Sequence, residues 1–470
     1  METRGVRTCS RGCVILLGSM RRGTRRLRAL STMAVSVSPP IASRRAGARL
    51  PALPANFLAE AAVVWLMLGM WLGLLGPLAP LMVLSGGAAL AALYPARLLR
   101  LVRLWPLLLI GLLALMSAVW SSEPQVSARY GLQLFVTLVI AAVAAVACRP
   151  AQLVRGLFIA CAVVLVLSIL SGRQGMSASG PVLIGLLGSK NEMGTLCFIL
   201  LAAGAAMAFG RDQPRFMRFA AIPVALLAAL YLLMAFSAGA VLGAVIFFGA
   251  FGVLLVGSKL SASAKFLLAL TIIVLAAPLW IIRADLAALW EYLVVDVLNK
   301  DPGLTGRDYL WAHADRLIAQ QPLLGHGYRS TWLGHGADTI GLLRWAKLQS
   351  GEGFSFHNSY REWLVDFGWV GAILIILALG VGLLRTVLRA MGPRTNAATL
   401  FFAAMGLVFA IRGYFEYVFG PFSSSTIIVV IVASMGYLAA PVAAAAPAVR
   451  TRSVELKVPG AQEPRHDAAV

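Results

Sequence analysis

Apolar residues along this chain occur in long runs that are separated by short polar segments. A run of about eighteen apolar residues is long enough to cross the hydrocarbon core of a bilayer as a helix. The pattern therefore predicts an all-α polytopic membrane protein with about twelve transmembrane helices. The predicted spans are residues 57–75, 77–94, 105–121, 131–148, 156–171, 191–209, 219–235, 238–257, 266–283, 362–384, 398–414 and 425–444.

The composition supports this class. Of the 470 residues, 60% are hydrophobic and 13% are charged, whereas globular domains carry about 25% charged residues. A soluble globular protein is therefore excluded. The cysteines are scattered without the spacing of a metal site or a disulfide framework, so we interpret them as small core residues. They are Cys9, Cys13, Cys148, Cys161 and Cys197.

The net charge of +21 is distributed as a signal of membrane topology rather than of nucleic-acid binding. Every second loop between the predicted spans is basic, as cytoplasmic loops are. The short intervening loops carry few basic residues, namely Arg129, Arg173, Lys190 and Arg412. The alternation predicts that both termini are cytoplasmic and that residues 284–361 face outward.

These patterns predict five parts of the chain. Residues 1–50 form a basic, disordered cytoplasmic tail, 51–283 contain the first nine spans, 284–361 form an outer catalytic loop, 362–444 contain the last three spans, and 445–470 form a second disordered cytoplasmic tail. The two halves of the chain show no repeated span pattern of the kind found in many transporters.

The outer loop is too long to be a simple connection, and its sequence predicts helices. Residues 284–298 can form an amphipathic helix. Thr305 and Asp308 have the spacing of a capping-box variant that would begin a second helix. In that helix the apolar side chains share an arc of about 120°, which predicts a cap with one apolar face. The arc contains Leu310, Trp311, Ala314, Leu317 and Ile318, while His313, Arg316 and Gln320 face away.

Two residues of the loop are candidates for chemistry. A histidine at position 357, five residues before a span, could act as a general base, because the surroundings of an imidazole easily move its pKa across neutrality. His357 and Asn358 could equally cap the following helix. Arg307 begins the cap helix, where a guanidinium can bind a phosphate in bidentate fashion. It could also pair with Asp308, and the sequence alone leaves both alternatives open.

Further ionisable residues stand at the outer ends of spans. Lys190 precedes Glu192, which enters an apolar segment where a charge is costly and often functional. Arg412 and Glu416 are four residues apart and can pair on one helix face, which would serve either binding or helix packing. His326 and His335 lie in Gly-His-Gly turns. No histidine pair has the spacing of a zinc helix, and no phosphate-binding or nucleophile motif occurs, so we expect no metal and no cofactor.

Five segments, in their order along the chain, resemble the O-antigen ligase and polymerase family of bacterial inner-membrane proteins. The resemblance covers roughly residues 57–440 and is closest to the exopolysaccharide polymerase branch. The segments are WSSEPQVSARYGLQL (120–134), SKNEMG (189–194), TGRDYLW (305–311), PLLGHGY (322–328) and HNSYREWLVDFGWVG (357–371).

The resemblance implies an all-helical membrane glycosyltransferase. Members take a glycan from an undecaprenyl diphosphate carrier at the periplasmic face and transfer it to another carrier-linked repeat unit (polymerases) or to lipid A-core or another acceptor (ligases). They need no metal or nucleotide sugar. The implied partners are the carrier-linked glycan and membrane lipid, with a chain-length regulator and a flippase as candidates, and no nucleic acid.

The motifs also suggest roles for individual residues. His357 matches the family's periplasmic histidine and would be the base, and Arg307 would act with it on the diphosphate. One position departs from the pattern, because Ala238 stands where many members have a cation. The remaining residues expected to bind substrate are Lys190, Asn191, Arg412, Glu416 and Asn358.

A polymerase is the preferred function, with a ligase as the alternative within the family. A transporter or flippase without covalent chemistry is the alternative from another class. A transporter would place ionisable residues in the middle of its spans along a path. Such residues are nearly absent here, while polar residues gather in the outer loop, which favours the transferase.

Overall fold

The computed structural model describes residues 55–177, 180–282, 285 and 306–438, which all belong to one compact unit of the chain. The predicted tails and the predicted amphipathic helix at 284–298 lie outside the described residues. The elements are α1 (Ala55–Trp71), η1 (Gly73–Leu75), α2 (Leu78–Leu93), η2 (Pro95–Leu104), α3 (Trp105–Met116), η3 (Ser117–Val119), α4 (Pro124–Ala147), α5 (Pro150–Ser171), β1 (Gln174–Ser177), β2 (Gly180–Leu183), α6 (Lys190–Phe209), α7 (Arg215–Met234), α8 (Ala238–Gly257), α9 (Ala262–Ile281), α11 (Arg307–Gln320), α12 (Ser330–Leu333), α13 (Ala337–Ala346), α14 (Ser359–Ala390), α15 (Ala397–Arg412) and α16 (Ser424–Leu438).

The described helices confirm the predicted class. Seven of them are long and apolar enough to cross a membrane, and five further apolar helices are shorter. Each predicted span overlaps one of these helices. An α-helix satisfies its backbone hydrogen bonds internally, which lipid requires of any spanning segment. The chain is therefore an all-α, multi-pass membrane protein, and its described strands form one antiparallel hairpin, β1–β2.

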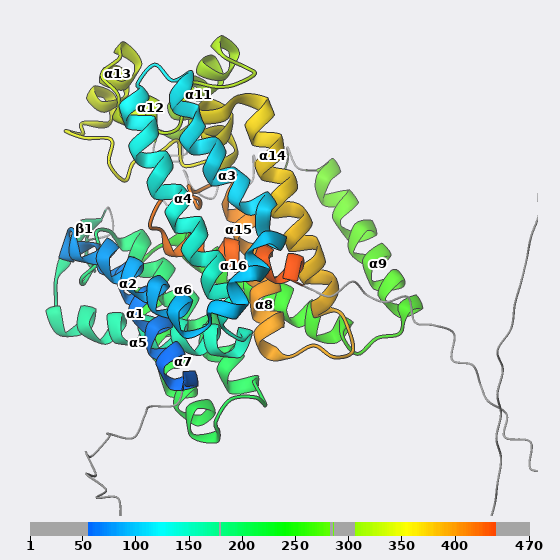
Figure 1. Cartoon of the computed structure of the whole chain (residues 1–470). Coiled ribbons are helices and arrows are strands. Elements are labelled where there is room, and N and C mark those ends of the chain that lie inside the picture. Colours follow the sequence, from blue (N-terminus) through cyan, green and yellow to red (C-terminus); the bar gives the residue numbers. More distant parts are fainter. Residues whose placement is uncertain (1–54, 178–179, 283–284, 286–305, 439–470) are drawn as a thin grey trace, which may run out of the picture. The chain divides into compact units, whose positions relative to one another are not determined.

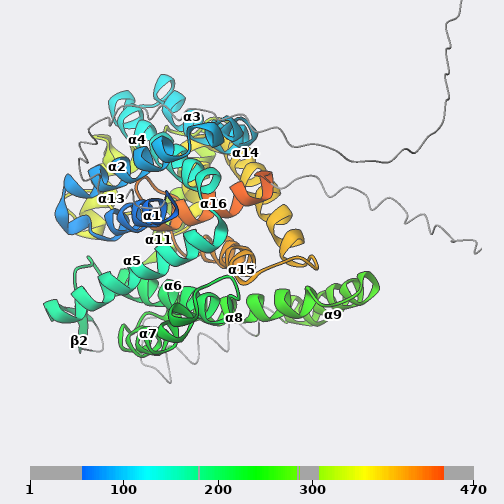
Figure 2. The ribbon, with the colours of Figure 1, turned by 60° about the horizontal axis from the view of Figure 1, so that its bottom comes forward.

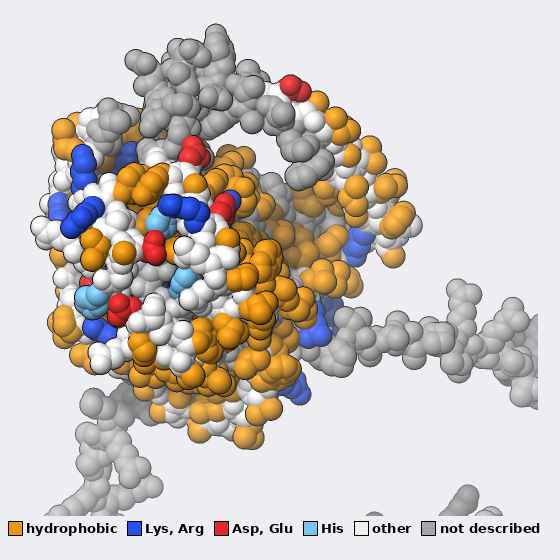
Figure 3. Space-filling view, turned by 90° about the horizontal axis from the view of Figure 1, so that it is seen from above, with side chains coloured by type: hydrophobic (Ala, Val, Ile, Leu, Met, Phe, Trp, Pro, Cys, Tyr) orange, Lys and Arg blue, Asp and Glu red, His pale blue; other side chains and the backbone are white. Residues whose placement is uncertain are grey.

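The described part of the predicted outer loop gathers at one end of the helix bundle, which we call the loop end. Helices α11, α12 and α13 lie there, above α3, α4 and α14 (Figure 1). In Figure 2, helices α6 to α9 form one side of the bundle and α2, α3, α4 and α14 the other, with α15 and α16 between them. Seen from the loop end, charged and histidine side chains gather on the loop and hydrophobic side chains surround them (Figure 3).

Helix α11 has the apolar face that the sequence predicts. Leu310, Ala314 and Leu317 are buried in a cluster with side chains from α12, α13 and α14, and Trp311 and Ile318 pack against it. The predicted capping box is not the start of this helix. Its N-cap is Gly306, at φ 83° and without a side-chain hydrogen bond, and Thr305 lies outside the described residues.

The prediction that His313 faces away from the packed side is wrong. Its ring is 7% exposed, because α13 covers that face of α11 and brings Asp338 within 3.2 Å of His313 Nε2. Burial lowers the pKa of His313, and the nearby Asp338 carboxylate only partly offsets this effect. Arg316 and Gln320 are exposed, as predicted.

A break in α14 lets the loop dock onto the bundle. Gly368 has φ 61° inside the helix, so the carbonyls before it are free to accept bonds from the loop. His326 N donates to Val365 O at 2.8 Å and Gly327 N donates to Asp366 O at 3.0 Å. A Cβ at Gly368 would lie 2.3 Å from the Leu323 carbonyl. Glycine is thus required at 368 both for its φ and for this close approach.

Two glycines allow α14 and α16 to cross closely. A Cβ at Gly436 would lie 2.0 Å from Gly382 O, and one at Gly382 would lie 2.7 Å from the backbone of Ala433. Small residues at such crossings let helices pack in lipid, where no hydrophobic force holds them together. Thr386 Oγ1 donates a hydrogen bond to Val432 O at 2.7 Å, which stabilises the same crossing.

We predict that Gly436→Val forces α14 and α16 apart and lowers the melting temperature of the purified protein. Overpacking of this kind costs about 1–3 kcal/mol. Gly380→Val is the matched control, since a Cβ at Gly380 has no atom within 4 Å and the substitution in a helix is the same. Equal melting temperatures for the two variants would contradict the prediction.

Candidate active site

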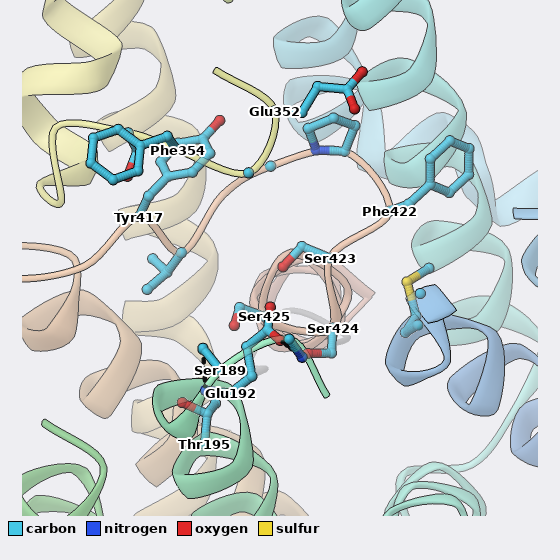
Figure 4. A pocket seen from close by; sticks show the side chains of 18 of the residues that line it. Ser189, Glu192, Thr195, Glu352, Phe354, Tyr417, Phe422, Ser423, Ser424 and Ser425 are labelled. Atoms are coloured by element: carbon cyan, nitrogen blue, oxygen red, sulfur yellow. Dashed lines mark hydrogen bonds between the residues drawn. The ribbon is translucent and has the colours of Figure 1, made fainter. Parts of the chain in front are cut away.

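A cavity of about 940 Å³ lies at the loop end, between the helices and the segment 351–357. Its size is that of a substrate site. Its lining comes from α4, from residues 186–192 before and within α6, from the loop, and from the turn between α15 and α16. Figure 4 shows Glu352 and Phe354 of the loop on one side of it, and the serines that begin α16 facing Ser189 of α6.

Three residues that the sequence singles out meet beside this cavity. Arg307 Nη2 lies 3.2 Å from Glu416 Oε1, and His357 Nδ1 lies 3.6 Å from Glu416 Oε2. One carboxylate therefore contacts both Arg307 at the start of α11 and His357, two residues before α14. Both His357 and Glu416 line the cavity. The predicted pairing of Glu416 with Arg412 on one helix face is wrong, because α15 ends at Arg412 and Glu416 lies in the following turn.

The surroundings of Glu416 favour its charged form. Burial acts to raise its pKa, but the neighbouring His357 imidazole and the charge of Arg307 outweigh burial and hold the pKa below its ordinary value. Glu416 is thus an anion near neutral pH. A fixed carboxylate at Nδ1 would hold the proton on that nitrogen and leave Nε2 as the base.

His357 has a backbone conformation that is uncommon for a residue with a side chain. Its φ is 50°, in the left-handed region, which costs energy and persists only where the surroundings enforce it. Here Ser355 Oγ accepts a bond from His357 N at 3.2 Å, and the Phe354 ring meets the imidazole edge to face. Within the described chain, His357 Nε2 has no hydrogen-bond partner.

The structure divides the residues expected to bind substrate. Arg412 and Asn191 line the cavity, but Lys190 does not, although it is the first residue of α6. Arg412 Nη2 donates to Thr195 Oγ1 at 3.1 Å. Asn191 Oδ1 accepts a bond from Ser237 Oγ at 3.1 Å.

Asn358 and Ala238 lie at helix N-termini near His357 and Glu416. The Asn358 side chain accepts bonds from Tyr360 N and Arg361 N, both at 3.0 Å. Asn358 therefore caps α14, which was the alternative to a role in substrate binding. Ala238 begins α8. A Cβ on the next residue, Gly239, would lie 3.7 Å from Glu416 Oε1. The position without the expected cation therefore lies close to a carboxylate that Arg307 already contacts.

Sequence reasoning missed Arg329, which holds the segment that carries His357. Its buried guanidinium donates to Gly351 O at 3.1 Å and to Phe354 O at 3.0 Å. It also lies 3.2 Å from Glu362 Oε1, while Glu362 Oε2 accepts a bond from Phe356 N at 2.9 Å. No sequence motif indicates these contacts, since they join residues up to thirty-three positions apart.

Two more arginines line the cavity, Arg129 of α4 and Arg173 before β1. The charge pattern of the sequence indicates them. Basic residues are rare in the short loops that the charge pattern places outside, and Arg129, Arg173 and Arg412 are three of the few. All three line this one cavity.

The other loop histidines lie apart from one another. His326 Nε2 is 2.9 Å from Leu317 O, His335 N donates to Glu123 Oε1 at 2.7 Å, and His313 contacts Asp338. Across the described ranges, no three His, Cys, Asp or Glu side chains form a group that could hold a metal ion.

Two comparisons show what this chain is similar to. Residues 223–376, which run from α7 into α14 and include His357 and Arg307, match the family model described as O-antigen ligase. The chain is also similar to the exopolysaccharide production protein ExoQ of Rhizobium meliloti (strain 1021). The two are 27% identical over 303 residues, which cover 63% of this chain and 68% of the relative.

The contacts of Glu416 predict a pH-dependent effect of Glu416→Gln. A carboxylate whose pKa is lowered by folding contributes stability above its ordinary pKa of 4.5, and loses this contribution as the pH falls through the lowered value. We expect the variant to be less stable than the parent at pH 7 by about 1–3 kcal/mol. The difference in melting temperature should shrink below pH 4.5. A difference that is constant with pH would contradict this assignment.

Proposed function

We propose that this chain is a membrane glycosyltransferase of the O-antigen ligase and exopolysaccharide polymerase family and that it polymerises glycan repeat units; the match of residues 223–376 to the O-antigen ligase model and the similarity to ExoQ support this proposal. The donor would be a repeat unit linked to undecaprenyl diphosphate, and the acceptor a second carrier-linked unit. The observation that carries this proposal is the contact of His357 with Glu416 at a cavity of about 940 Å³.

In the proposed step, an acceptor hydroxyl attacks the anomeric carbon of the donor sugar. The bond between that carbon and the diphosphate oxygen breaks, and its electron pair leaves with the prenyl diphosphate. His357 Nε2 takes the proton of the attacking hydroxyl. Glu416 stabilises the imidazolium that forms, and Arg307 keeps Glu416 charged and in place.

The leaving group carries two or more negative charges, so cations must face it as the bond breaks. Arg412, Arg129 and Arg173 line the cavity from three different parts of the chain. This set supports the proposal better than Lys190, which does not line it. The absent cation at Ala238 is then no obstacle, because the arginines of the cavity supply the charge.

A polymerase is preferred because the similar protein ExoQ is named for exopolysaccharide production. A ligase would use the same donor and the same base, and would differ in its acceptor. A transporter without covalent chemistry would leave the glycan on its carrier. The products formed in cells and in vesicles distinguish the three.

We predict that His357→Ala, expressed in a strain that lacks the native gene, abolishes long-chain glycan while the protein remains in the membrane. Loss of a general base lowers a rate about 10²–10⁴-fold. A single repeat unit should accumulate on the lipid carrier, which can be measured by mass spectrometry of extracted lipids.

His335→Ala is the matched control, since His335 lies in the same loop with its side chain 89% exposed, and it should give normal polymer. Finished polymer on the carrier would identify a ligase instead. Normal polymer in a strain that expresses His357→Ala would overturn the assignment of His357 as the general base. Purified protein that moves the lipid-linked unit across vesicles but never lengthens it would identify a transporter.

We further propose that the protein lies in the inner membrane with its loop end in the periplasm and both termini in the cytoplasm. The alternation of basic loops supports this orientation. A periplasm-active reporter fused near Gly336 of the loop should be active, and one fused near Arg215, at the start of α7, should be inactive. The reverse result would overturn the orientation.

A further inference from the structure

The segment between α2 and α3 is a 3₁₀ helix of unusual length. Element η2 contains ten residues, Pro95–Leu104, whereas runs of more than three or four residues are uncommon in this conformation. Trp120, which follows α3 closely, donates from Nε1 to Leu324 O of the loop at 2.9 Å. The end of α3 therefore meets the loop end, and the start of α3, where η2 joins it, lies at the opposite end of the bundle.

The sequence of η2 gives it three columns of side chains with different chemistry. A 3₁₀ helix has three residues per turn, so side chains three positions apart lie one above another. One column consists of leucines, the second is apolar and exposed, and the third consists of arginines. The leucine column is Leu98, Leu101 and Leu104, the exposed apolar column is Leu99, Val102 and the following Trp105, and the arginine column is Arg97, Arg100 and Arg103.

The leucine column determines which way η2 is turned. Its last member, Leu104, is fully buried, and the other two pack against the core of the bundle. Arg97 adds a second attachment, because it donates to Ala147 O at the end of α4 and its guanidinium lies 4.1 Å from the centre of the Tyr94 ring. Since the leucines face the bundle, the rest of the exposed apolar column and the arginine column must face away from it.

The outward side of η2 places an apolar strip beside two unpaired cations. Leu99 is 81% exposed, Val102 75% and Trp105 64%. Arg100 and Arg103 are exposed, and within the described part of the chain they make no hydrogen bond or ion pair. No acidic residue occurs in η2, so this element does not neutralise its own charge.

The spans that flank η2 place it at the membrane surface. Residues 77–94 and 105–121 are predicted spans, so the ten residues between them lie where the hydrocarbon meets the headgroups. Tryptophan, found here at position 105, is enriched at that depth. The charge pattern explains why arginines occur on this side of the bundle, but it does not explain why they form a column beside an apolar one. An amphipathic element of this kind binds lipid with its apolar side and anionic headgroups with its basic side.

We propose that η2 is a binding site for an acidic phospholipid. Arg100 and Arg103, about 6 Å apart at the rise of a 3₁₀ helix, bind the phosphate of the headgroup. The exposed apolar column contacts the acyl chains. A soluble anion would not use that column, and a zwitterionic phospholipid would bring no net charge to the two guanidinium groups. In the proposed orientation the lipid belongs to the cytoplasmic leaflet, whose surface potential is negative. The site does not depend on the transferase reaction.

Native mass spectrometry of the full-length protein in a neutral detergent tests this site. The protein is freed of co-purified lipid and titrated with phosphatidylglycerol or with phosphatidylcholine of the same acyl chains. We expect the parent to bind phosphatidylglycerol about tenfold more tightly than phosphatidylcholine. In Arg100→Gln/Arg103→Gln we expect about tenfold weaker binding of phosphatidylglycerol and the loss of this preference, because two cations beside an anionic lipid account for a factor of that size.

Lys259→Gln/Arg394→Gln is the matched control. It removes the same charge from two other basic loops, those between α8 and α9 and between α14 and α15, and both side chains are exposed. This control should bind phosphatidylglycerol as tightly as the parent. Unchanged binding in Arg100→Gln/Arg103→Gln would overturn the proposal. Equal weakening in the control and in this variant would also overturn it, because net charge alone would then explain the binding.

Leu99→Ser/Val102→Ser tests the exposed apolar column without changing the charge. Weaker binding of phosphatidylglycerol in this variant would support a site for the whole lipid. Unchanged binding would overturn the assignment to a lipid, and competition by glycerol 3-phosphate would then identify a soluble anion as the ligand. The substituted side chains are exposed, so the melting temperatures without lipid should equal that of the parent. Arg103→Gln alone serves as the test if the double arginine variant does not fold.

Discussion

The buried contact between Arg329 and Glu362 is the interaction on which the candidate site depends. Arg329 belongs to the loop and Glu362 to α14, and together they hold the carbonyls of Gly351 and Phe354 and the amide of Phe356. The segment before His357 has no regular secondary structure, so these bonds determine its course. Removing one member of such a pair leaves a buried charge and costs about 3–5 kcal/mol. The strained backbone of His357 persists because this segment is fixed.

The same constraint explains how a polar site can exist at the end of an apolar bundle. The break at Gly368 frees the carbonyls of Val365 and Asp366, and the loop binds to them. Charged groups are then paired within the loop end rather than inside the bundle. Glu416 is matched by Arg307 and His357, and Arg329 by Glu362. Arg412 is not matched in this way, because two of its nitrogens lack a partner among the described residues.

The membrane helices could be predicted from the sequence because each depends on a local property, the length of an apolar run. The apolar face of α11 could be predicted for the same reason, since residues three and four apart share one face. The burial of His313 could not be predicted, because it depends on α13. That helix covers α11, and its Asp338 lies twenty-five positions after His313. Arg329 could not either, since its partners are distant in sequence. The prediction that Arg412 pairs with Glu416 on one helix face was wrong, because the spacing of residues alone does not locate the end of a helix well.

The distribution of charge held more information than the motifs did. Cations are disfavoured on the side that the basic loops leave outside, so an arginine retained there needs a reason. Arg412 is more than two hundred positions from Arg129 and Arg173, yet all three line one cavity. Glu416, a carboxylate that lies near the residue after Ala238, is already matched by its own partners. An anion that enters the cavity therefore meets arginines that the chain has left without a carboxylate, and an anionic leaving group beside a histidine base is what a glycosyl transfer from a diphosphate carrier requires.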